Sequence, residues 1–214
     1  MQTEFDGHIR ILCQESKLSS LQNLRVLNLY DNSLISLQGI GALTSIEIEE
    51  INLGSNKLES LPPEFGMFSS LKSLWLDDNN LESFPDCLCQ LSGLKILRLS
   101  GNRLITIPPT ISSLCQLESI SIDNNEIKEF PVGLIELSNS LRHLWIRQNK
   151  LSEIPESISR LTLLETLCVS SNLLKSLPKC LSSMKSSLRK IYANGNQIEE
   201  FSDDLSELSK LEVS

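Results

Sequence analysis

The sequence predicts an α/β-type solenoid, a stack of short coils that each contain one strand, a tight turn and a return segment. The first observation is an asparagine that recurs every 23 or 24 residues, at Asn32, Asn56, Asn79, Asn102, Asn125, Asn149, Asn172 and Asn196. The second is the phrase L-x-x-L-x-L-x-x-N-x-L around it, as in Leu71, Leu74, Leu76, Asn79 and Leu81. A fixed period of about 20 to 29 residues is typical of solenoids, in which each coil packs against its neighbours.

The residues before each asparagine are expected to form a short strand. Leu74 and Leu76 alternate with Ser73, Trp75 and Asp77, which is strand periodicity. The leucines therefore point inward and the residues between them point outward. The chain then turns sharply, and an asparagine amide can both donate to and accept from the backbone groups of a turn. We expect the stacked asparagines to form a hydrogen-bonded ladder.

The return segment has its own marker, because six of the eight prolines recur in phase. They follow an apolar residue in each case, at Pro62, Pro85, Pro108, Pro131, Pro155 and Pro178. Proline fixes the backbone angle φ and removes a donor, so this side is expected to be extended or a short, tight helical turn. Two apolar residues then close each coil, for example Leu88 and Leu91.

These motifs resemble the leucine-rich repeat proteins of the typical 23-residue class with the L-P-x-x-L signature, including the Ras-group intracellular scaffolds. The resemblance covers about residues 21 to 214. It implies a right-handed horseshoe with a parallel β-sheet on the concave face, short 3-10 or extended segments on the convex face, and few long helices. It also implies a protein partner, with a small GTPase or another signalling protein as the class to test.

The domain organisation follows from the same ladder. Residues 1–20 are expected to form an N-terminal cap or degenerate repeat, and residues 21–210 eight repeats. Residues 211–214 would be the start of a ninth repeat or the chain end. A solenoid exposes an apolar cross-section at each end, so a cover is needed there.

The outward-facing strand residues are the candidate binding surface, because they line one wall. All four Trp and Tyr residues fall on it, and large amphipathic rings on an exposed wall are typical of binding hot spots. Strand preference alone would be the alternative explanation. The predicted partner-binding residues are Tyr30, Trp75, Asp77, Arg98, Asp123, His143, Trp145, Arg147 and Tyr192.

Charges on this wall alternate from coil to coil, and the outer members, Lys95, Glu118, Arg142, Glu165 and Arg189, are expected to pair across strands with little effect on stability. The wall carries eight positive and eight negative groups, so it is formally neutral. The net charge of −8 then comes from the rest of the molecule. A nucleic-acid or anionic-membrane surface would need a basic stripe, and neither partner is expected.

Enzyme activity, cofactors and metals are not expected. The sequence has no phosphate loop and no dinucleotide-binding glycine motif. Cys87 and Cys89 are followed by no second pair at zinc spacing. His143 and Cys168 lie diagonally on neighbouring coils, but no oxyanion donors accompany them.

Three functions remain. The leading hypothesis is a non-catalytic interaction module or scaffold that binds a protein on the concave face. The second is a recognition or regulatory segment of a larger signalling enzyme or receptor, such as a kinase, ligase or cyclase. The third is an extracellular recognition domain. The polar, acidic N-terminus and the scattered cysteines favour a cytoplasmic protein over an exported one.

Overall fold

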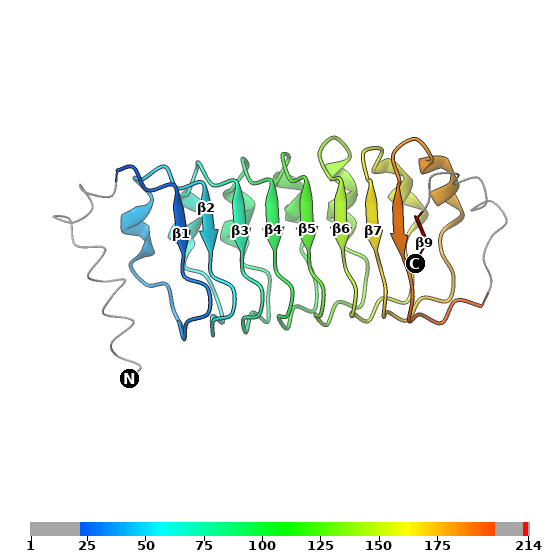
Figure 1. Cartoon of the computed structure of the whole chain (residues 1–214), viewed down its shortest axis with the longest axis horizontal. Coiled ribbons are helices and arrows are strands. Elements are labelled where there is room, and N and C mark those ends of the chain that lie inside the picture. The colour runs from blue at the N-terminus through cyan, green and yellow to red at the C-terminus, as the bar shows by residue number, and fades with distance from the viewer. Residues whose placement is uncertain (1–21, 200–211, 214) are drawn as a thin grey trace.

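The computed structural model describes residues 22–199 and 212–213, which form one row of stacked coils (Figure 1). One parallel sheet runs along the row with its nine strands in sequence order. The strands are β1 (Val26–Asn28), β2 (Glu50–Asn52), β3 (Ser73–Trp75), β4 (Ile96–Arg98), β5 (Ser119–Ser121), β6 (His143–Trp145), β7 (Thr166–Cys168), β8 (Lys190–Tyr192) and β9 (Glu212–Val213). The predicted solenoid with a parallel sheet is confirmed.

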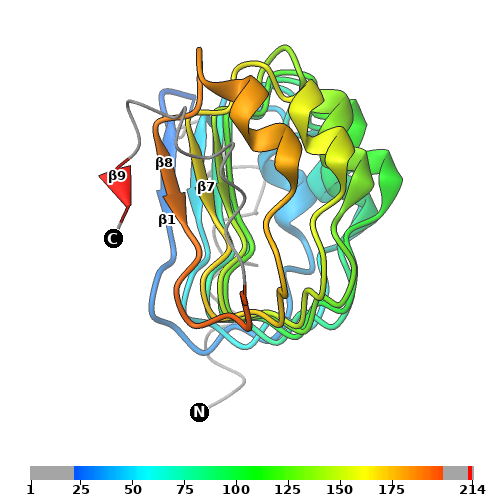
Figure 2. The same cartoon turned by 90° about the vertical axis from the view of Figure 1, so that its right-hand side faces the viewer.

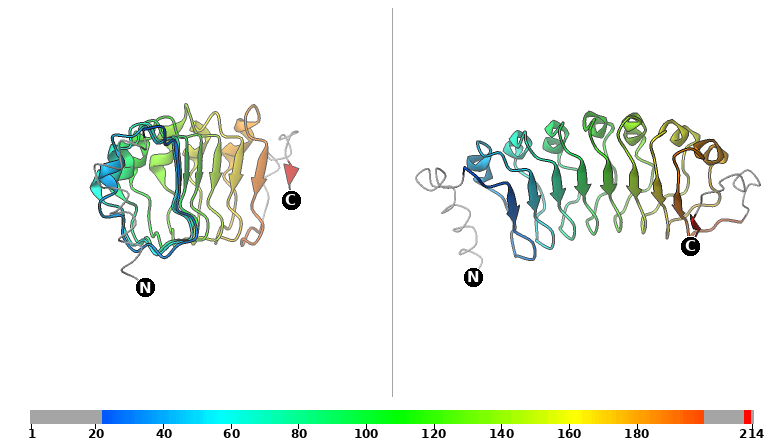
Figure 3. Two further views of the ribbon diagram at one scale, coloured as in Figure 1. Left: turned by 60° about the vertical axis from the view of Figure 1, so that its left-hand side comes forward. Right: turned by 45° about the horizontal axis from the view of Figure 1, so that its top comes forward.

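The side of each coil opposite the strand is formed by a 3-10 helix of four to six residues, which Figure 2 shows facing away from the sheet. These helices are η2 (Ile40–Leu43), η3 (Pro63–Met67), η4 (Asp86–Gln90), η5 (Pro109–Ser113), η6 (Val132–Leu137), η7 (Glu156–Arg160) and η8 (Lys179–Met184). They occupy the outer side of a gently curved row, with the strands inside (Figure 3). None of the helices in the described residues combines the length and apolar character needed to cross a lipid bilayer.

The in-phase prolines explain where the helices begin. Each of the six is the extended residue directly before a 3-10 helix, as at Pro62 before η3 and Pro178 before η8. A fixed φ and a missing donor suit that position. Where the first described coil lacks a proline, Gly39 precedes η2 with a φ of 91°. Both structures that the sequence allowed for the return segment therefore occur, first extended chain and then a tight helical turn.

The core is a single apolar column inside the coils. Leu74 and Leu76 are fully buried, as are the coil-closing Leu88 and the equivalent Ile111 and Ile158. Four phenylalanines, Phe65, Phe68, Phe84 and Phe130, are also buried. Neighbouring coils share this interior through 3-10 helix packing and strand pairing, so no coil has a core of its own.

The asparagine ladder forms as predicted and links each coil to the one before. Asn79 Nδ2 donates to the carbonyl oxygens of Leu76 and Asp77 in its own turn and of Leu53 in the preceding coil, at 3.0 to 3.2 Å. Its Oδ1 accepts from the Leu58 N–H at 2.9 Å. The same pattern recurs at Asn56, Asn102, Asn125, Asn149 and Asn172. The ladder therefore satisfies buried backbone groups that the turns leave unpaired.

The residue before each ladder asparagine lies in the left-handed backbone region. Six of these are not glycine, with φ between 50° and 54°, namely Asp31, Ser55, Asp78, Asn124, Gln148 and Ser171, and the other two are Gly101 and Gly195 at 68°. That backbone is unfavourable for L-residues with a Cβ. This left-handed conformation reverses the chain, so that the side-chain amide of the next residue, the asparagine, can donate to the carbonyl oxygens at the end of the strand.

The two ends of the predicted domain organisation lie mostly outside the described residues. This applies to the N-terminal cap in residues 1–20 and to residues 200–211. The short strand β9 pairs in parallel with β8, with Lys190 beside Glu212 and Ile191 beside Val213. The division into cap, eight repeats and a further start stays a prediction.

Candidate functional site

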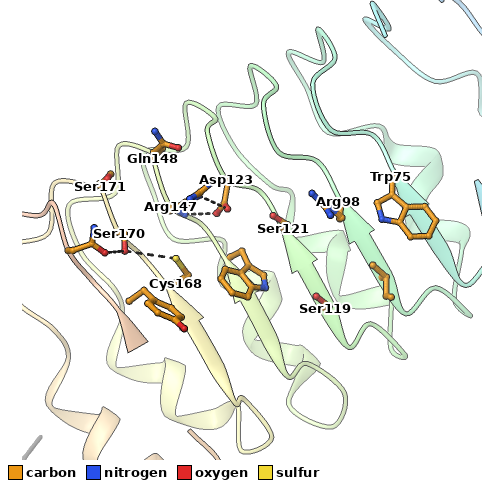
Figure 4. Close-up of a pocket in the computed structure, with 14 residues that line it drawn as sticks. Trp75, Arg98, Ser119, Ser121, Asp123, Arg147, Gln148, Cys168, Ser170 and Ser171 are labelled. Carbon is orange, nitrogen blue, oxygen red and sulfur yellow. Dashed lines mark hydrogen bonds and ion pairs between the residues drawn. The ribbon is translucent and has the colours of Figure 1, made fainter. Parts of the chain in front are cut away.

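A groove of about 860 Å³ opens on the strand face of the sheet, over the coils from β3 to β8 (Figure 4). It is lined by Trp75, Ile96, Arg98, Ser119, Ser121, Asp123, Trp145, Arg147, Gln148, Cys168, Ser170, Ser171, Tyr192 and Asn194. Six of the nine predicted partner-binding residues are among them: Trp75, Arg98, Asp123, Trp145, Arg147 and Tyr192. We call this surface the concave groove.

The other three predicted residues lie outside the groove lining. Tyr30 follows β1, two coils before Trp75, and is 54% exposed. Asp77 lies beneath Arg98, with only 14% of its side chain exposed. His143 is on β6, where its Nδ1 lies 3.3 Å from the Thr166 hydroxyl, so its imidazole is engaged along the sheet instead of with Cys168.

One column of the sheet register brings the groove residues together. Trp75 pairs with Arg98, Arg98 with Ser121 and Ser121 with Trp145. Ser121, a small residue, thus separates two large side chains, Arg98 on one side and Trp145 on the other. The Ser121 hydroxyl lies 2.6 Å from that of Ser100, which holds it close to the sheet. Ser121 therefore lines the groove as a small residue between Arg98 and Trp145.

The same column continues from Trp145 through Cys168 to Tyr192. The rings of Trp145 and Tyr192 stack at a centroid distance of 6.1 Å and an interplanar angle of 20°. Cys168, which the sequence placed on the exposed wall, is instead 4% exposed, as a small side chain between the two rings in the register and beside the equally buried Thr166 and Ser170. Burial also raises the pKa of the Cys168 thiol. Cys168 is therefore a spacer beneath an aromatic platform.

Both groove arginines are held by an aspartate of the preceding coil. Arg98 Nε lies 2.8 Å from Asp77 Oδ2, and Arg147 Nε lies 3.0 Å from Asp123 Oδ2. Burial raises the pKa of both carboxyls, although the neighbouring arginine and a backbone hydrogen bond act in the opposite direction. The charges of the groove are thus fixed in place by the fold.

The outer charges of the wall pair across strands as predicted in two cases. Lys95 Nζ lies 2.8 Å from Glu118 Oε1, and Arg142 Nη1 lies 2.7 Å from Glu165 Oε1. Arg189 departs from the prediction, because its Nη2 donates to the Ser186 carbonyl and its Nη1 is buried without a hydrogen-bond partner. These pairs are exposed and contribute little to stability.

Sequence reasoning missed Gln148 and Ser171 as groove residues. Both occupy the left-handed position before a ladder asparagine, and both line the groove. Seven of the eight residues at that position are Gly, Asn, Asp or Ser, which favour turns and tolerate a left-handed backbone. The fixed place directly before each ladder asparagine was the available signal, since Gln148 is the one residue there outside these four types.

The groove chemistry suits recognition. Its lining combines aromatic rings, two guanidinium groups and serine hydroxyls on an open surface. Among the described residues, no cluster of three or more His, Cys, Asp or Glu side chains could hold a metal ion. The five described cysteines are free thiols.

A family model described as "Leucine rich repeat" matches residues 46–104 and 115–174, which is more than half of the chain. The chain therefore belongs to the leucine-rich repeat family. Its repeats, buried leucines and asparagine ladder are the features that place it there.

Similar curated proteins share only part of the chain. Osteomodulin from Rattus norvegicus is 34% identical over 80 residues, covering 34% of this chain and 19% of that protein. The probable serine/threonine-protein kinase pats1 from Dictyostelium discoideum is 40% identical over 82 residues, covering 36% of this chain and 3% of that protein. This chain thus matches a fifth or less of the length of either relative.

Solved structures match nearly the whole chain. A leucine-rich repeat protein from Leptospira interrogans is 30% identical with a TM-score of 0.81, covering 94% of this chain and 56% of that one. An internalin from Listeria monocytogenes, 24% identical with a TM-score of 0.75 and covering 94% and 63%, is similar in fold. The ectodomain of the plant membrane receptor kinase GASSHO1/SCHENGEN3 from Arabidopsis thaliana, solved in complex with CASPARIAN STRIP INTEGRITY FACTOR 2, is 29% identical with a TM-score of 0.74, covering 92% and 24%.

Proposed function

We propose that this chain is a non-catalytic interaction module that binds a protein partner in the concave groove. The observation that carries this proposal is the placement of both tryptophans and the stacked Trp145–Tyr192 pair in one groove. Aromatic residues that contribute most to protein binding cluster in this way at the centre of interfaces.

The groove is also organised before any partner arrives. Trp145 and Tyr192 support each other through their stacked rings, with Cys168 filling the space beneath. Arg98 and Arg147 are fixed by Asp77 and Asp123. Side chains that are already ordered lose little conformational entropy on binding, which favours affinity.

The dimensions suit a protein segment. The groove extends over the coils from β3 to β8, and five strand spacings amount to about 24 Å. That length exceeds what one small ligand covers and matches about seven residues of extended chain. The similar receptor kinase ectodomain was solved in complex with CASPARIAN STRIP INTEGRITY FACTOR 2. That complex supports the proposal that this fold binds a partner.

Affinity capture with mass spectrometry tests the proposal. The native chain is compared with the Trp75→Ala/Trp145→Ala variant, and with Met67→Ala/Val132→Ala as the matched control. Met67 and Val132 are exposed apolar residues of η3 and η6 on the outer side. We expect the native chain and the control to retain the same partner and the tryptophan variant to lose it. Equal capture by all three folded proteins would disprove the role of the groove.

A second candidate is a recognition segment of a larger signalling enzyme or receptor. In two similar proteins the matched region is a small part of a longer chain. This sequence matches 3% of pats1 and 24% of the receptor kinase chain. An immunoblot of the endogenous protein distinguishes the two, because a module that acts alone would migrate near 24.0 kDa. A much larger band would support the second candidate.

The cellular location is part of the proposal as well. We propose a cytoplasmic protein with reduced cysteines, and a small GTPase or another signalling protein remains the partner class that the resemblance implies. Thiol titration of the unfolded, unreduced protein purified from its own cells gives the test. Six reactive thiols, one for each cysteine of the sequence, support this location, whereas paired cysteines favour an extracellular domain.

A further inference from the structure

The two ion pairs of the groove expose their partners unequally. The side chains of Arg98 and Arg147 are 51% and 56% exposed, while those of Asp77 and Asp123 are 14% and 11% exposed. A ligand that enters the groove therefore meets mainly the guanidinium groups, because Asp77 lies outside the lining and Asp123, which is part of it, exposes little of its carboxylate. The wall is neutral by count, but its accessible charge in the groove is positive.

The contact atoms of the arginines point to the same conclusion. Both guanidinium groups use Nε to contact the aspartate. Within residues 22–199 neither the Nη1 nor the Nη2 group of Arg98 or Arg147 donates a hydrogen bond. A guanidinium edge with both Nη groups available can bind a carboxylate in a bidentate manner.

The aspartates are held so that they cannot compete for the outer edge. Asp77 Oδ1 accepts from the Ser100 N–H at 3.0 Å, and Asp123 Oδ1 accepts from the Arg147 N–H at 2.8 Å. Each carboxylate is thereby tied to the backbone of the next coil. Arg98 and Arg147 are thus two oriented cations, each beside a carboxylate that is largely covered (Figure 4 shows Arg98, Asp123 and Arg147).

We propose that the groove binds an extended acidic segment of a protein partner, with two carboxylates on Arg98 and Arg147 and an apolar or aromatic side chain against Trp145 and Tyr192. This inference rests on the proposed function and adds the chemistry of the partner. Arg98 on β4 and Arg147 just after β6 are two strands apart and two residues offset, about 12 Å between Cα atoms by sheet geometry. In an extended segment, that distance separates residues about four positions apart.

A displayed library of random decapeptides tests the inference, with the native protein as bait. We expect the recovered peptides to be enriched in Asp and Glu about four positions apart and depleted in Lys and Arg. Both tryptophans of the chain line the groove, so each synthetic peptide can be checked by its effect on tryptophan fluorescence. Replacing one acid of a recovered peptide by its amide should weaken binding about tenfold or more.

Three variants assign the effect to the groove. Arg98→Gln/Arg147→Gln should abolish the acid enrichment, and Arg103→Gln/Arg160→Gln, which removes two exposed charges outside the groove lining, should preserve it. Arg98→Lys/Arg147→Lys keeps a cation beside each buried aspartate. It should bind with intermediate affinity because the bidentate edge is lost. Circular dichroism confirms that each variant is folded.

The outcomes separate the two proposals. Two outcomes would overturn the acidic-segment inference and leave the proposed function intact. In the first, the recovered peptides depend on Trp145 but show no preference for acidic residues. In the second, the preference for acidic residues persists in Arg98→Gln/Arg147→Gln. If Trp145→Ala weakens none of the recovered peptides, peptide recognition by the groove is disproved and the inference fails. A ten-residue oligodeoxythymidine is the second probe, since aromatic rings and arginine also bind single-stranded nucleic acid. If the native protein binds this oligonucleotide and Trp145→Ala does not, the inference is overturned in favour of a nucleic-acid ligand.

Discussion

The rings of Trp145 and Tyr192 stack although the two residues lie two strands apart, with ring centroids 6.1 Å apart and Cys168 between them in the register. Two strand spacings amount to about 9.6 Å, so the rings must lean toward each other. They can do so because the intervening side chain is small. The pair thus forms one continuous aromatic platform at one end of the concave groove.

The size of the side chain at position 168 therefore determines whether the rings of Trp145 and Tyr192 can stack. Cys168→Leu would push the rings apart, and we expect a changed near-ultraviolet circular dichroism signal and a loss of partner affinity of about tenfold or more. Cys168→Ala leaves the rings room to stack and is the matched control. An unchanged spectrum and affinity in Cys168→Leu would contradict the role of the spacer.

Thiol reactivity gives an independent check of the same burial. Cys115 is exposed, whereas Cys168 is buried and its thiol pKa is raised by burial. Because the thiolate is the reactive form, we expect iodoacetamide to modify Cys115 much faster than Cys168 in the folded protein. Peptide mass spectrometry after timed alkylation measures both rates. Equal rates would mean that the platform does not cover Cys168.

Each asparagine of the ladder should contribute measurably to stability. Asn102→Ala removes donors to the Leu76 and Leu99 carbonyls and the acceptor of the Leu81 N–H, all in buried surroundings. We expect the free energy of unfolding to fall by about 2 to 4 kcal/mol, measured by urea denaturation. Arg103→Ala, at the neighbouring exposed position, is the control and should cost far less. A loss of less than about 0.5 kcal/mol in Asn102→Ala would refute the ladder's role.

Because Gly101 lies in the left-handed backbone region, replacing it by alanine should destabilise the fold more than the same replacement at an ordinary glycine. Gly101 has a φ of 68°, and a Cβ there would meet the Asp78 carboxylate. We expect Gly101→Ala to lower the free energy of unfolding by about 1 to 2 kcal/mol. Gly93, where a Cβ would meet the flexible Lys72 Nζ at 3.3 Å, provides the control Gly93→Ala. If the two variants unfold at the same urea concentration, backbone strain at residue 101 is not significant.

Asp123 predicts a pH dependence. Burial raises its folded-state pKa above the ordinary value of 3.8, so the folded protein binds the proton more tightly than the unfolded chain. The resulting stabilisation is present below that value and is lost as pH rises through the raised pKa. Asp123→Asn cannot titrate there. Its stability relative to the native protein should therefore improve as pH rises through this window, measured by thermal unfolding at constant ionic strength, and a flat difference would contradict the shift.

The sequence was sufficient for the fold because the determining interactions repeat. The period of Asn79 and its equivalents located the strands from β1 to β8, and alternation separated the buried Leu74 from the outward Trp75. The groove was predictable only in part. Which residues face outward follows from the pleat, but the lean of Trp145 over Cys168 depends on side-chain packing between three coils.

The charge of the groove was also predictable only in part. The sequence gives the number of charged residues on the wall, but their exposure depends on the geometry. Equal numbers of acids and bases on the wall indicated neutrality. The depth difference between Arg147 and Asp123 depends on which side chain reaches back to a backbone N–H. A linear sequence does not contain that choice of hydrogen-bond partner, which changes the groove surface from the neutral one expected to a positive one.

The most direct test of the central claim uses the two tryptophans as reporters. The chain is labelled with 5-fluorotryptophan, which gives one fluorine resonance for Trp75 and one for Trp145, assigned with the single Trp→Phe variants. Addition of the captured partner should shift or broaden both resonances in the native protein, and equally in Met67→Ala/Val132→Ala. If the partner binds and both resonances stay unchanged, the concave groove is not the binding site.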